Sequence, residues 1–387
     1  MTAPGAANAE GRAATTPGWP ALALSDCARP RVGARSRSAY TVLGFAGYGV
    51  ANVLGVWLAL AWQLSLVERL IGFLVPPLAF VVTVAVAIVI KGREWLVFYQ
   101  VLFAALAAVA GAAVATGSAL GRLLDLTTLA IGAFLVLGRL GCFHVACCHG
   151  RPLRAASGRR WRLGVAYGPA HVAAGFWPRW QGRPLVPVQL VESAASALWV
   201  GGALAGSAVP GRAAAIYATG YAVSRFGLEL WRGDPVRPYW RGLSEAQWAS
   251  LLLLVAVALA WPAWWTLVAL LASGALALAL VRAAPRRSFT LPPHLRELDD
   301  LARQLLAEPA PGRRDSQLGV GLSVDLLPDG RRDWILSSHH PAWSLGIAQQ
   351  LAAALWPQAQ VRPGRTPSLV HVIESVRSDV NNGVRPP

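Results

Sequence analysis

The sequence predicts an all-α polytopic membrane protein, with seven or eight transmembrane helices and a small soluble α+β appendage at its C-terminal end. Hydrophobic residues make up 55% of the 387 residues, charged residues make up 14%, and the mean hydropathy is +0.45. These values are too apolar for an ordinary soluble domain. Several apolar runs reach the roughly 17–25 residues that a helix needs to cross a bilayer. From about residue 286 the composition changes sharply toward that of a soluble domain.

The chain begins with a basic arm, residues 1–37, that is rich in Ala, Gly, Pro and Arg. This arm lacks the continuous apolar core of a signal peptide, so we expect it to be disordered.

A transmembrane domain is predicted over residues 38–285, because the apolar runs follow one another closely there. Pro262 and Ala263 alone separate the last two runs, which leaves the count at seven or eight. The predicted spans are Thr41–Gln63, Ile71–Ile90, Leu96–Thr116, Leu126–Val145, Leu190–Ala208, Ala213–Trp231, Trp248–Trp261 and Trp264–Val281.

A long extramembrane loop, residues 150–187, mixes arginines with aromatic residues such as Tyr167, Phe176, Trp177 and Trp180. This mixture is typical of a surface at the level of the lipid headgroups, and a solvated basic loop is the alternative. The net charge of +16 is accordingly attributed to basic residues beside the spans, which set the topology and contact membrane lipids. No nucleic-acid partner is expected.

Residues 286–387 are predicted to form the α+β appendage, and we assign it no chemistry. The adjacent His339 and His340 have no nearby ligands at metal-binding spacing, so we expect them simply to be exposed. The predicted elements are a helix over Leu291–Glu308, strands over Val320–Leu327 and Trp334–Ser338, a helix over Trp343–Trp356 and a strand over Ser368–Ile373.

Charged side chains inside two of the spans carry the main functional signal. Arg139 lies within the fourth apolar run, where an arginine costs about 2.5–3.5 kcal/mol unless it faces water, a carboxylate or an anionic ligand. Tyr221, Arg225 and Glu229 are spaced four apart in the sixth run, and therefore share one helix face. Two guanidinium groups converging on one phosphate would explain this pattern. The alternative is an Arg225–Glu229 ion pair that only fixes helix packing, which would leave Arg139 without a partner.

Polar residues at the edges of other spans are more ambiguous. Gln189 and Glu192 open the fifth run, and Asp125 opens the fourth. Each acid has a simpler interpretation as a charge at the positive end of a helix dipole.

A cluster of Cys142, His144, Cys147, Cys148 and His149 favours a rival hypothesis, a metal site or a thiol-redox site. These five residues crowd into the end of one helix, where few of them can point at a single ion. We therefore expect neither a metal nor another cofactor.

The segment Gly138-Arg139-Leu140-Gly141-Cys142-Phe143, followed by Cys147-Cys148-His149-Gly150-Arg151-Pro152, resembles the signature of the prolipoprotein diacylglyceryl transferase family. The form is that of a divergent member of the Cys-Cys-x-Gly subgroup. Asp125, the Pro187/Gln189/Leu190/Glu192 pattern, the Tyr221/Arg225/Glu229 stripe and Gly242-Leu243-Ser244 with Gln247 have counterparts in the same order, so the resemblance covers about residues 40–254.

The resemblance implies transfer of the diacylglyceryl group of phosphatidylglycerol to the lipobox cysteine thiol in the signal peptide of a prolipoprotein. This is the first step of bacterial lipoprotein maturation, in the inner (plasma) membrane. Arg139 would then hold the phosphate, Arg225 would stabilise the leaving phosphate, Glu229 would orient Arg225, and Tyr221 would hydrogen-bond to the donor. The remaining residues that the resemblance assigns to substrate binding are Tyr40, Gly141, Cys142, Gly150, Arg151, Gln189, Glu192 and Arg232.

One departure from the family concerns the base. Members commonly carry a His-Gly-Gly-Leu segment at the start of the third span, and here the stretch reads Phe98-Tyr99-Gln100-Val101-Leu102. Tyr99, His144, His149 and Glu229 are the alternative acceptors of the thiol proton. A paralogue that binds phospholipid without this activity, or that acts on another acceptor, is the alternative function.

The side on which the long loop lies is a second point of tension. The basic arm, the loop at Lys91-Gly92-Arg93 and the arginine-rich loop favour the cytoplasm by charge, whereas the family resemblance implies the outer side, which we favour. In that orientation seven spans would place the appendage in the cytoplasm, and eight would place it outside.

Overall fold

The computed structural model describes residues 38–92, 97–153, 164–308 and 312–375, together with the backbone of the two-residue strands β1 (Leu22–Ala23), β2 (Arg31–Val32) and β3 (Arg35–Ser36). Apart from those strands, the arm that we expected to be disordered lies outside the described residues. The arginine-rich centre of the long loop, residues 154–163, lies outside them too.

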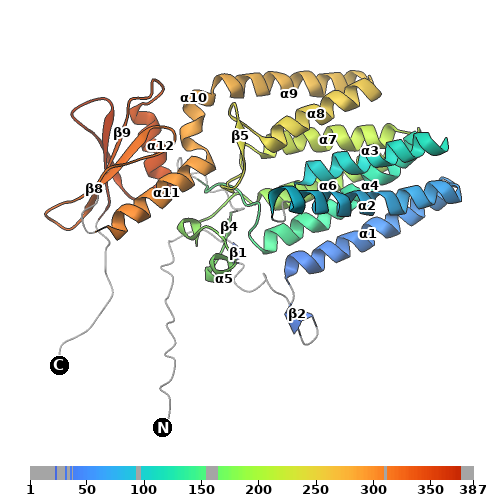
Figure 1. Ribbon diagram of the computed structural model, residues 1–387, viewed down its shortest axis with the longest axis horizontal. Helices are drawn as coiled ribbons and strands as arrows, with labels where there is room; N and C mark the ends of the chain where they lie inside the picture. The colour runs from blue at the N-terminus through green and yellow to red at the C-terminus, as the bar shows by residue number, and fades with distance from the viewer. Residues whose placement is uncertain are drawn as a thin grey trace, which may run out of the picture.

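In the described part of the chain, eight long helices form one bundle (Figure 1). Six of them are long and apolar enough to cross a membrane, while α7 and α8, with 17 and 16 residues, are shorter members of the same bundle. The prediction of a polytopic helical membrane protein is thus confirmed. The helices are α1 (Ala39–Ala61), α2 (Leu66–Lys91), α3 (Phe98–Thr116), α4 (Leu120–His144), α6 (Val188–Ala205), α7 (Arg212–Leu228), α8 (Glu245–Ala260) and α9 (Trp264–Arg282).

Two helices begin earlier than their apolar runs, because an acid lies in their first two turns. Helix α2 starts after Ser65, whose hydroxyl accepts from the Glu68 backbone N–H while the Glu68 carboxylate accepts from the Ser65 backbone N–H. Helix α4 starts at Leu120, so Asp125 lies in its second turn rather than opening it. Hydropathy alone places both starts too late, since a satisfied acid near a helix start interrupts the run without ending the helix.

Helix α4 is the centre of the bundle and packs against α1, α3, α6 and α7. Small residues and hydroxyls allow this close packing, as is usual for helices in membranes. The Ser193 hydroxyl donates to the Val136 carbonyl at 2.8 Å, and the Ser196 hydroxyl donates to the Gly132 carbonyl at 3.0 Å. These bonds fix α6 against α4 at the depth where the charged residues lie.

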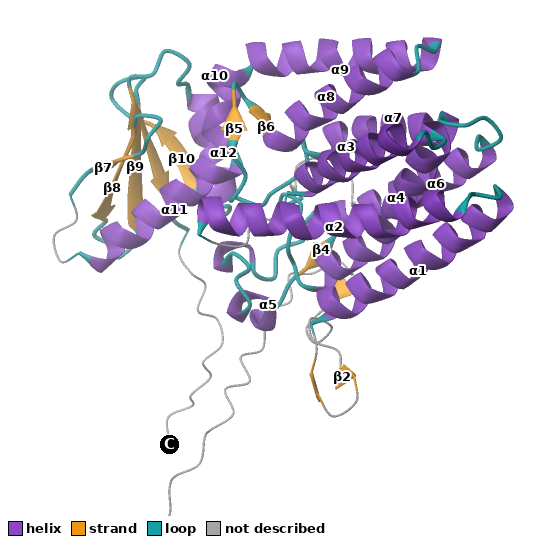
Figure 2. Cartoon of the chain, turned by 45° about the vertical axis from the view of Figure 1, so that its right-hand side comes forward, coloured by secondary structure: helices purple, strands orange, loops and turns teal. Residues whose placement is uncertain are grey.

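The even number of bundle helices that the structure describes has a topological consequence. The start of α1, the long loop and the end of α9 all lie at one end of the bundle, and tight turns close the other end (Figures 1 and 2). The appendage therefore lies on the same side as the long loop.

The appendage contains a sheet whose described strands run in the order β10-β11-β9-β8-β7, all antiparallel. The hairpin of β8 and β9 turns at Pro328-Asp329-Gly330, where the sequence predicts it, and Trp334 and Leu336 on β9 are buried under the helices. The elements are α10 (Ala284–Arg287), η2 (Ser288–Thr290), α11 (Pro292–Ala307), β7 (Arg314–Asp315), β8 (Val320–Leu326), β9 (Arg332–Ser338), α12 (Leu345–Leu355), β10 (Gln360–Pro363) and β11 (Leu369–Ile373).

The long loop contains β4 (Val165–Ala166), α5 (Pro169–Ala173) and η1 (Pro178–Trp180). The aromatic residues that the structure describes in this loop are buried rather than presented to headgroups or solvent. The Trp177 indole N–H donates to the Asp299 carboxylate on α11 at 2.8 Å, and Arg179 pairs with the same carboxylate. Both expectations for Tyr167, Phe176, Trp177 and Trp180 were therefore wrong, because these rings form a continuous core with the appendage.

Candidate functional site

A buried ion pair joins α4 and α6 near the loop end of the bundle. The Arg139 guanidinium lies 2.8 Å from the Glu192 carboxylate, and both side chains are almost fully buried. Arg139 thus has a carboxylate of the protein as its partner. The alternative interpretation, in which an Arg225–Glu229 pair leaves Arg139 without a partner, does not account for this contact. Glu192, in the second turn of α6, is also more than a charge at a helix start.

Two further arginines reach the same carboxylate. Arg225 on α7 lies 3.6 Å from Glu192 and 2.5 Å from Glu229, which follows the last residue of α7. Arg232, in the segment after α7, lies 3.8 Å from Glu192 and is fully buried. Glu192 therefore stands at the meeting point of three guanidinium groups that come from three separate segments.

Arg237 and Asp234 complete the group, and sequence reasoning missed both. Asp234 accepts from Arg232 and Arg237 at 2.8 Å each, and Arg237 lies 3.3 Å from Glu229. Burial alone would raise the pKa of Asp234, but the two guanidinium groups lower it to about 2. The signal available in the sequence was the close alternation of charge in Arg232-Gly233-Asp234-Pro235-Val236-Arg237.

We call these seven residues the arginine cluster. Among the residues that the structure describes, four guanidinium groups in it meet three carboxylates, so it carries one excess positive charge. Three buried nitrogens of the cluster, Nε of Arg139 and Nη1 of Arg225 and Arg232, have no hydrogen-bond partner among the described residues, and the same holds for Oε2 of Glu192 and both carboxylate oxygens of Glu229. Buried guanidinium nitrogens without a partner suit an anionic ligand that accepts hydrogen bonds from several guanidinium groups at once.

Two tyrosines lie against the cluster in different ways. The Tyr221 hydroxyl donates to the Glu192 carboxylate at 3.3 Å, which joins it to the cluster. The Tyr99 hydroxyl instead pairs with the Ser250 hydroxyl on α8 at 2.6 Å, while its ring lies 5.9 Å from the Tyr221 ring. Tyr99 thus contacts the cluster through Tyr221 and not through its own oxygen.

The two histidines of the motif differ in their surroundings, and only the His149 ring packs into the loop. The His149 ring packs edge-on against Phe176 and Trp180, its Nδ1 lies 3.0 Å from the Gly150 carbonyl, and burial lowers the pKa of His149. His144 is partly buried, and its carbonyl lies 3.1 Å from Nε2 of His171. Within the described ranges, neither His144 nor His149 forms a hydrogen bond with the arginine cluster.

Gly150 and Arg151 hold the segment after α7 against the end of the motif. Gly150 pairs with Arg232 as a β-bridge, and Nε of Arg151 donates to the Arg232 carbonyl at 2.9 Å. A Cβ on Gly150 would lie 2.2 Å from the Val186 carbonyl oxygen, so a side chain does not fit there. Both residues thereby position Arg232.

Cys142 is buried near the end of α4, and Cys147 and Cys148 lie in the turn that follows. The three sulfur atoms lie within 4.8 Å of one another. Gln189 supports this turn, because its amide donates to the Cys147 carbonyl at 2.8 Å. Gly141 allows α1 to approach, since a Cβ there would lie 3.1 Å from Cα of the half-exposed Tyr40.

Asp125 lies at the opposite end of the bundle and has a structural role. Its carboxylate accepts from the backbone N–H groups of Gly211 and Ala214 at 2.8 and 2.7 Å. Asp125 therefore caps the start of α7, the helix that carries Arg225, from the neighbouring α4.

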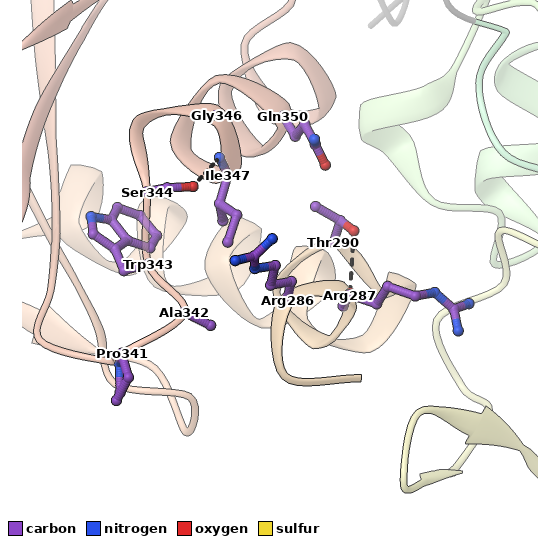
Figure 3. A pocket seen from close by; sticks show the side chains of 10 residues that line it. All are labelled: Arg286, Arg287, Thr290, Pro341, Ala342, Trp343, Ser344, Gly346, Ile347 and Gln350. Atoms are coloured by element: carbon purple, nitrogen blue, oxygen red, sulfur yellow. Dashed lines mark hydrogen bonds between the residues drawn. The ribbon is translucent and has the colours of Figure 1, made fainter. Parts of the chain in front are cut away.

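A separate pocket of about 490 Å³ lies in the appendage, between the segment after α9 and the start of α12. Figure 3 shows Arg286 pointing toward Ser344 and Ile347, whereas Arg287 points away from them. The Ser344 hydroxyl already caps α12 by accepting from the Ile347 N–H. His339 and His340 are both exposed, as expected.

The chain matches the model of a known protein family. A family model described as prolipoprotein diacylglyceryl transferase matches residues 40–264, more than half of the chain and nearly all of α1 to α8. No curated protein matches the chain. The matched region contains every residue of the arginine cluster and the three cysteines, and it excludes the appendage.

Proposed function

The chain belongs to the prolipoprotein diacylglyceryl transferase family, and on that premise we propose that it transfers the diacylglyceryl group of phosphatidylglycerol to the lipobox cysteine thiol of prolipoproteins in the bacterial plasma membrane. The observation that carries the proposal is the buried arginine cluster with its excess positive charge and its unpartnered nitrogens. A phosphodiester carries a single negative charge that such a cluster can bind.

The donor phosphate is bound by Arg139, Arg225 and Arg232 in this proposal. Planar guanidinium forks bind phosphate oxygens in pairs and remain charged at every relevant pH. Their partners Glu192 and Glu229 hold the forks in place before the donor arrives, so little reorganisation is needed on binding.

The reaction replaces one bond at the glyceryl carbon of the donor. The thiolate sulfur of the lipobox cysteine attacks that carbon, a carbon–sulfur bond forms, and the carbon–oxygen bond to the phosphate breaks. Negative charge grows on the leaving phosphate, where the arginines stabilise it more strongly than in the bound donor. The released product is glycerol 1-phosphate.

Two of the four alternative acceptors of the thiol proton, Tyr99 and His149, are engaged away from the arginine cluster. Tyr99 is paired with Ser250, and the His149 ring packs against Phe176 and Trp180 in the loop. Glu229 lies in the cluster, but Arg225 and Arg237 engage its carboxylate and make it a weak base.

The proposal is tested by complementation of a bacterial strain depleted of its own diacylglyceryl transferase, with the mobility shift of a reporter prolipoprotein as the readout. We expect the wild-type chain to restore the shift and Arg139→Ala to lose it, since removing one such electrostatic group costs at least about 100-fold in rate. Arg212→Ala is the matched control, because Arg212 is an exposed arginine outside the cluster.

An immunoblot must show equal amounts of each variant in the membrane. The proposal fails when the wild-type chain reaches the membrane and leaves the reporter unmodified. That result would favour the alternative of a phospholipid-binding paralogue, which the neutral Tyr99–Ser250 pair at the place of the family histidine supports. Phosphatidylglycerol retained by the purified wild type and lost by Arg139→Ala would then identify it.

A further inference from the structure

The three sulfur atoms of Cys142, Cys147 and Cys148 converge on one point beside the arginine cluster. They lie within 4.8 Å of one another. Zinc–thiolate bonds of about 2.3 Å in tetrahedral geometry separate sulfur atoms by about 3.8 Å. The three sulfurs therefore need to approach one another by at most about 1 Å to bind one ion.

The backbone around the cysteines is shaped for this convergence. Helix α4 ends at His144. Beyond it, the backbone of Ala146 and Cys148 is left-handed, with φ of 58° and 57°, a conformation that residues other than glycine rarely adopt. Such strain persists only where the surroundings impose it, and it gathers at functional sites. Here the Tyr167 hydroxyl holds the Phe143 carbonyl at 3.1 Å and Gln189 holds the Cys147 carbonyl at 2.8 Å.

Positive charge lies beside two of the cysteines. Cys142 follows Arg139 by one helical turn, and Cys148 lies close enough to Arg139 and Arg232 for their charges to interact. Nearby guanidinium groups stabilise thiolates, which are the form that binds metals. Cys147 and Cys148 are only partly buried, so an ion has a way in.

We propose that Cys142, Cys147 and Cys148 bind a zinc ion through three thiolates, and that the lipobox thiol takes the fourth coordination position. Three protein ligands with one open position are the pattern of catalytic rather than structural zinc sites. The crowding that argued against a metal does not prevent this arrangement, because the two histidines need not take part.

This inference rests on the proposed function, and it accounts for the missing histidine of the family. A thiol that binds zinc loses its proton without a strong base. The zinc-bound sulfur then attacks the glyceryl carbon, the electron pair of the carbon–oxygen bond leaves with the phosphate, and the thiol proton ends on the released glycerol phosphate. The thioether formed is neutral and leaves the ion.

The first test is the zinc content of the full-length chain purified in detergent, measured by elemental analysis. We expect about one zinc ion per chain. In Cys147→Ser the zinc affinity should fall by more than the roughly 10–100-fold that loss of an outer-shell partner costs. Cys27→Ser is the matched control, because it removes the one cysteine outside the motif, and it should bind zinc as the wild type does.

Cobalt(II) substitution gives a readout that does not depend on activity. The wild-type chain loaded with cobalt should show thiolate-to-cobalt charge-transfer bands and the visible bands of a tetrahedral ion. A lipobox peptide should shift these bands when it carries cysteine and leave them unchanged when it carries serine at that position.

The outcomes separate this inference from the proposed function. Absence of zinc from the wild type, equal zinc in Cys147→Ser, or a disulfide among the three cysteines overturns the site, even when the chain complements. If the cysteine-containing peptide leaves the cobalt bands unchanged, the proposal that the lipobox thiol takes the fourth coordination position is overturned. Zinc and the spectral shift in a chain that fails to complement support the site and overturn the proposed function.

Discussion

Glu192 shows how a single residue can organise a charged site inside a membrane protein. Its carboxylate contacts Arg139, Arg225, Arg232 and Tyr221, which come from α4, from α7 and from the segment after α7. From the sequence, Glu192 could be taken for an ordinary acid at a helix start. The spacing of Tyr221, Arg225 and Glu229 indicates one helix face, but the convergence of residues 139, 192 and 225 depends on how three helices pack.

Replacing Glu192 by glutamine should destabilise the protein strongly. The change leaves three buried guanidinium groups short of a carboxylate, and breaking a buried pair in this way costs about 3–5 kcal/mol. Thermal unfolding of the detergent-solubilised protein measures the loss. Glu245→Gln, at the partly exposed start of α8, is the matched control and should change little.

The double variant Arg139→Leu with Glu192→Leu completes the test. Removing both partners takes away the uncompensated charge of the single variant, so the double variant should be more stable than Glu192→Gln, while it remains inactive. A double variant that is less stable than the single one would contradict the view that Glu192 acts mainly by neutralising the arginines.

At the scale of elements, apolar length predicts the helices well and predicts their ends poorly. The predicted start of the second span at Ile71 misses the first turn of α2, because Glu68 interrupts the apolar run while capping the helix. In the sixth span the helix ends at Leu228, so Glu229 lies just beyond it. The pairing of Asp125 with α7 joins residues far apart in the sequence, and no local pattern reveals it.

Asp125→Ala should weaken the start of α7, the helix that carries Tyr221 and Arg225. The variant loses the bonds to the Gly211 and Ala214 N–H groups, and loss of such a cap costs about 0.5–2 kcal/mol. Asp125→Asn keeps one acceptor oxygen and should lose less. Hydrogen exchange at the first turn of α7 measures the difference, and equal protection in both variants would show that Asp125 is not the cap.

At the scale of the whole molecule, the appendage is predicted as a separate unit and is found docked on the long loop. Trp177 and Arg179 bind Asp299, and Arg183 donates to the Ala354 carbonyl at 3.0 Å. The mixture of arginines and aromatic residues that indicates a lipid surface equally suits a protein interface. Composition cannot distinguish a lipid-facing surface from a protein interface, because both kinds of surface bury aromatic rings beside charged groups.

Asp299→Ala should loosen the appendage from the loop. Hydrogen bonds to a charged group contribute about 1.5–3 kcal/mol, so local opening should become roughly 10–100-fold more frequent. Limited tryptic cleavage after Arg179 measures it, because the next arginine, Arg183, is followed by Pro184 and is not a tryptic site. Asp300→Ala is the control, since Asp300 is the half-exposed neighbour on α11. Equal cleavage of the two variants would argue against the docking.

The shared charges of α4, α6 and α7 also bear on how the chain enters the membrane during synthesis. Arg139 emerges from the ribosome well before Glu192, its partner. At about 5–20 residues per second, the roughly fifty intervening residues take several seconds to make. An arginine without a partner is costly inside the lipid bilayer. Helix α4 therefore has a reason to stay beside the insertion machinery until α6 arrives, so that these helices enter the bilayer as a group rather than one at a time.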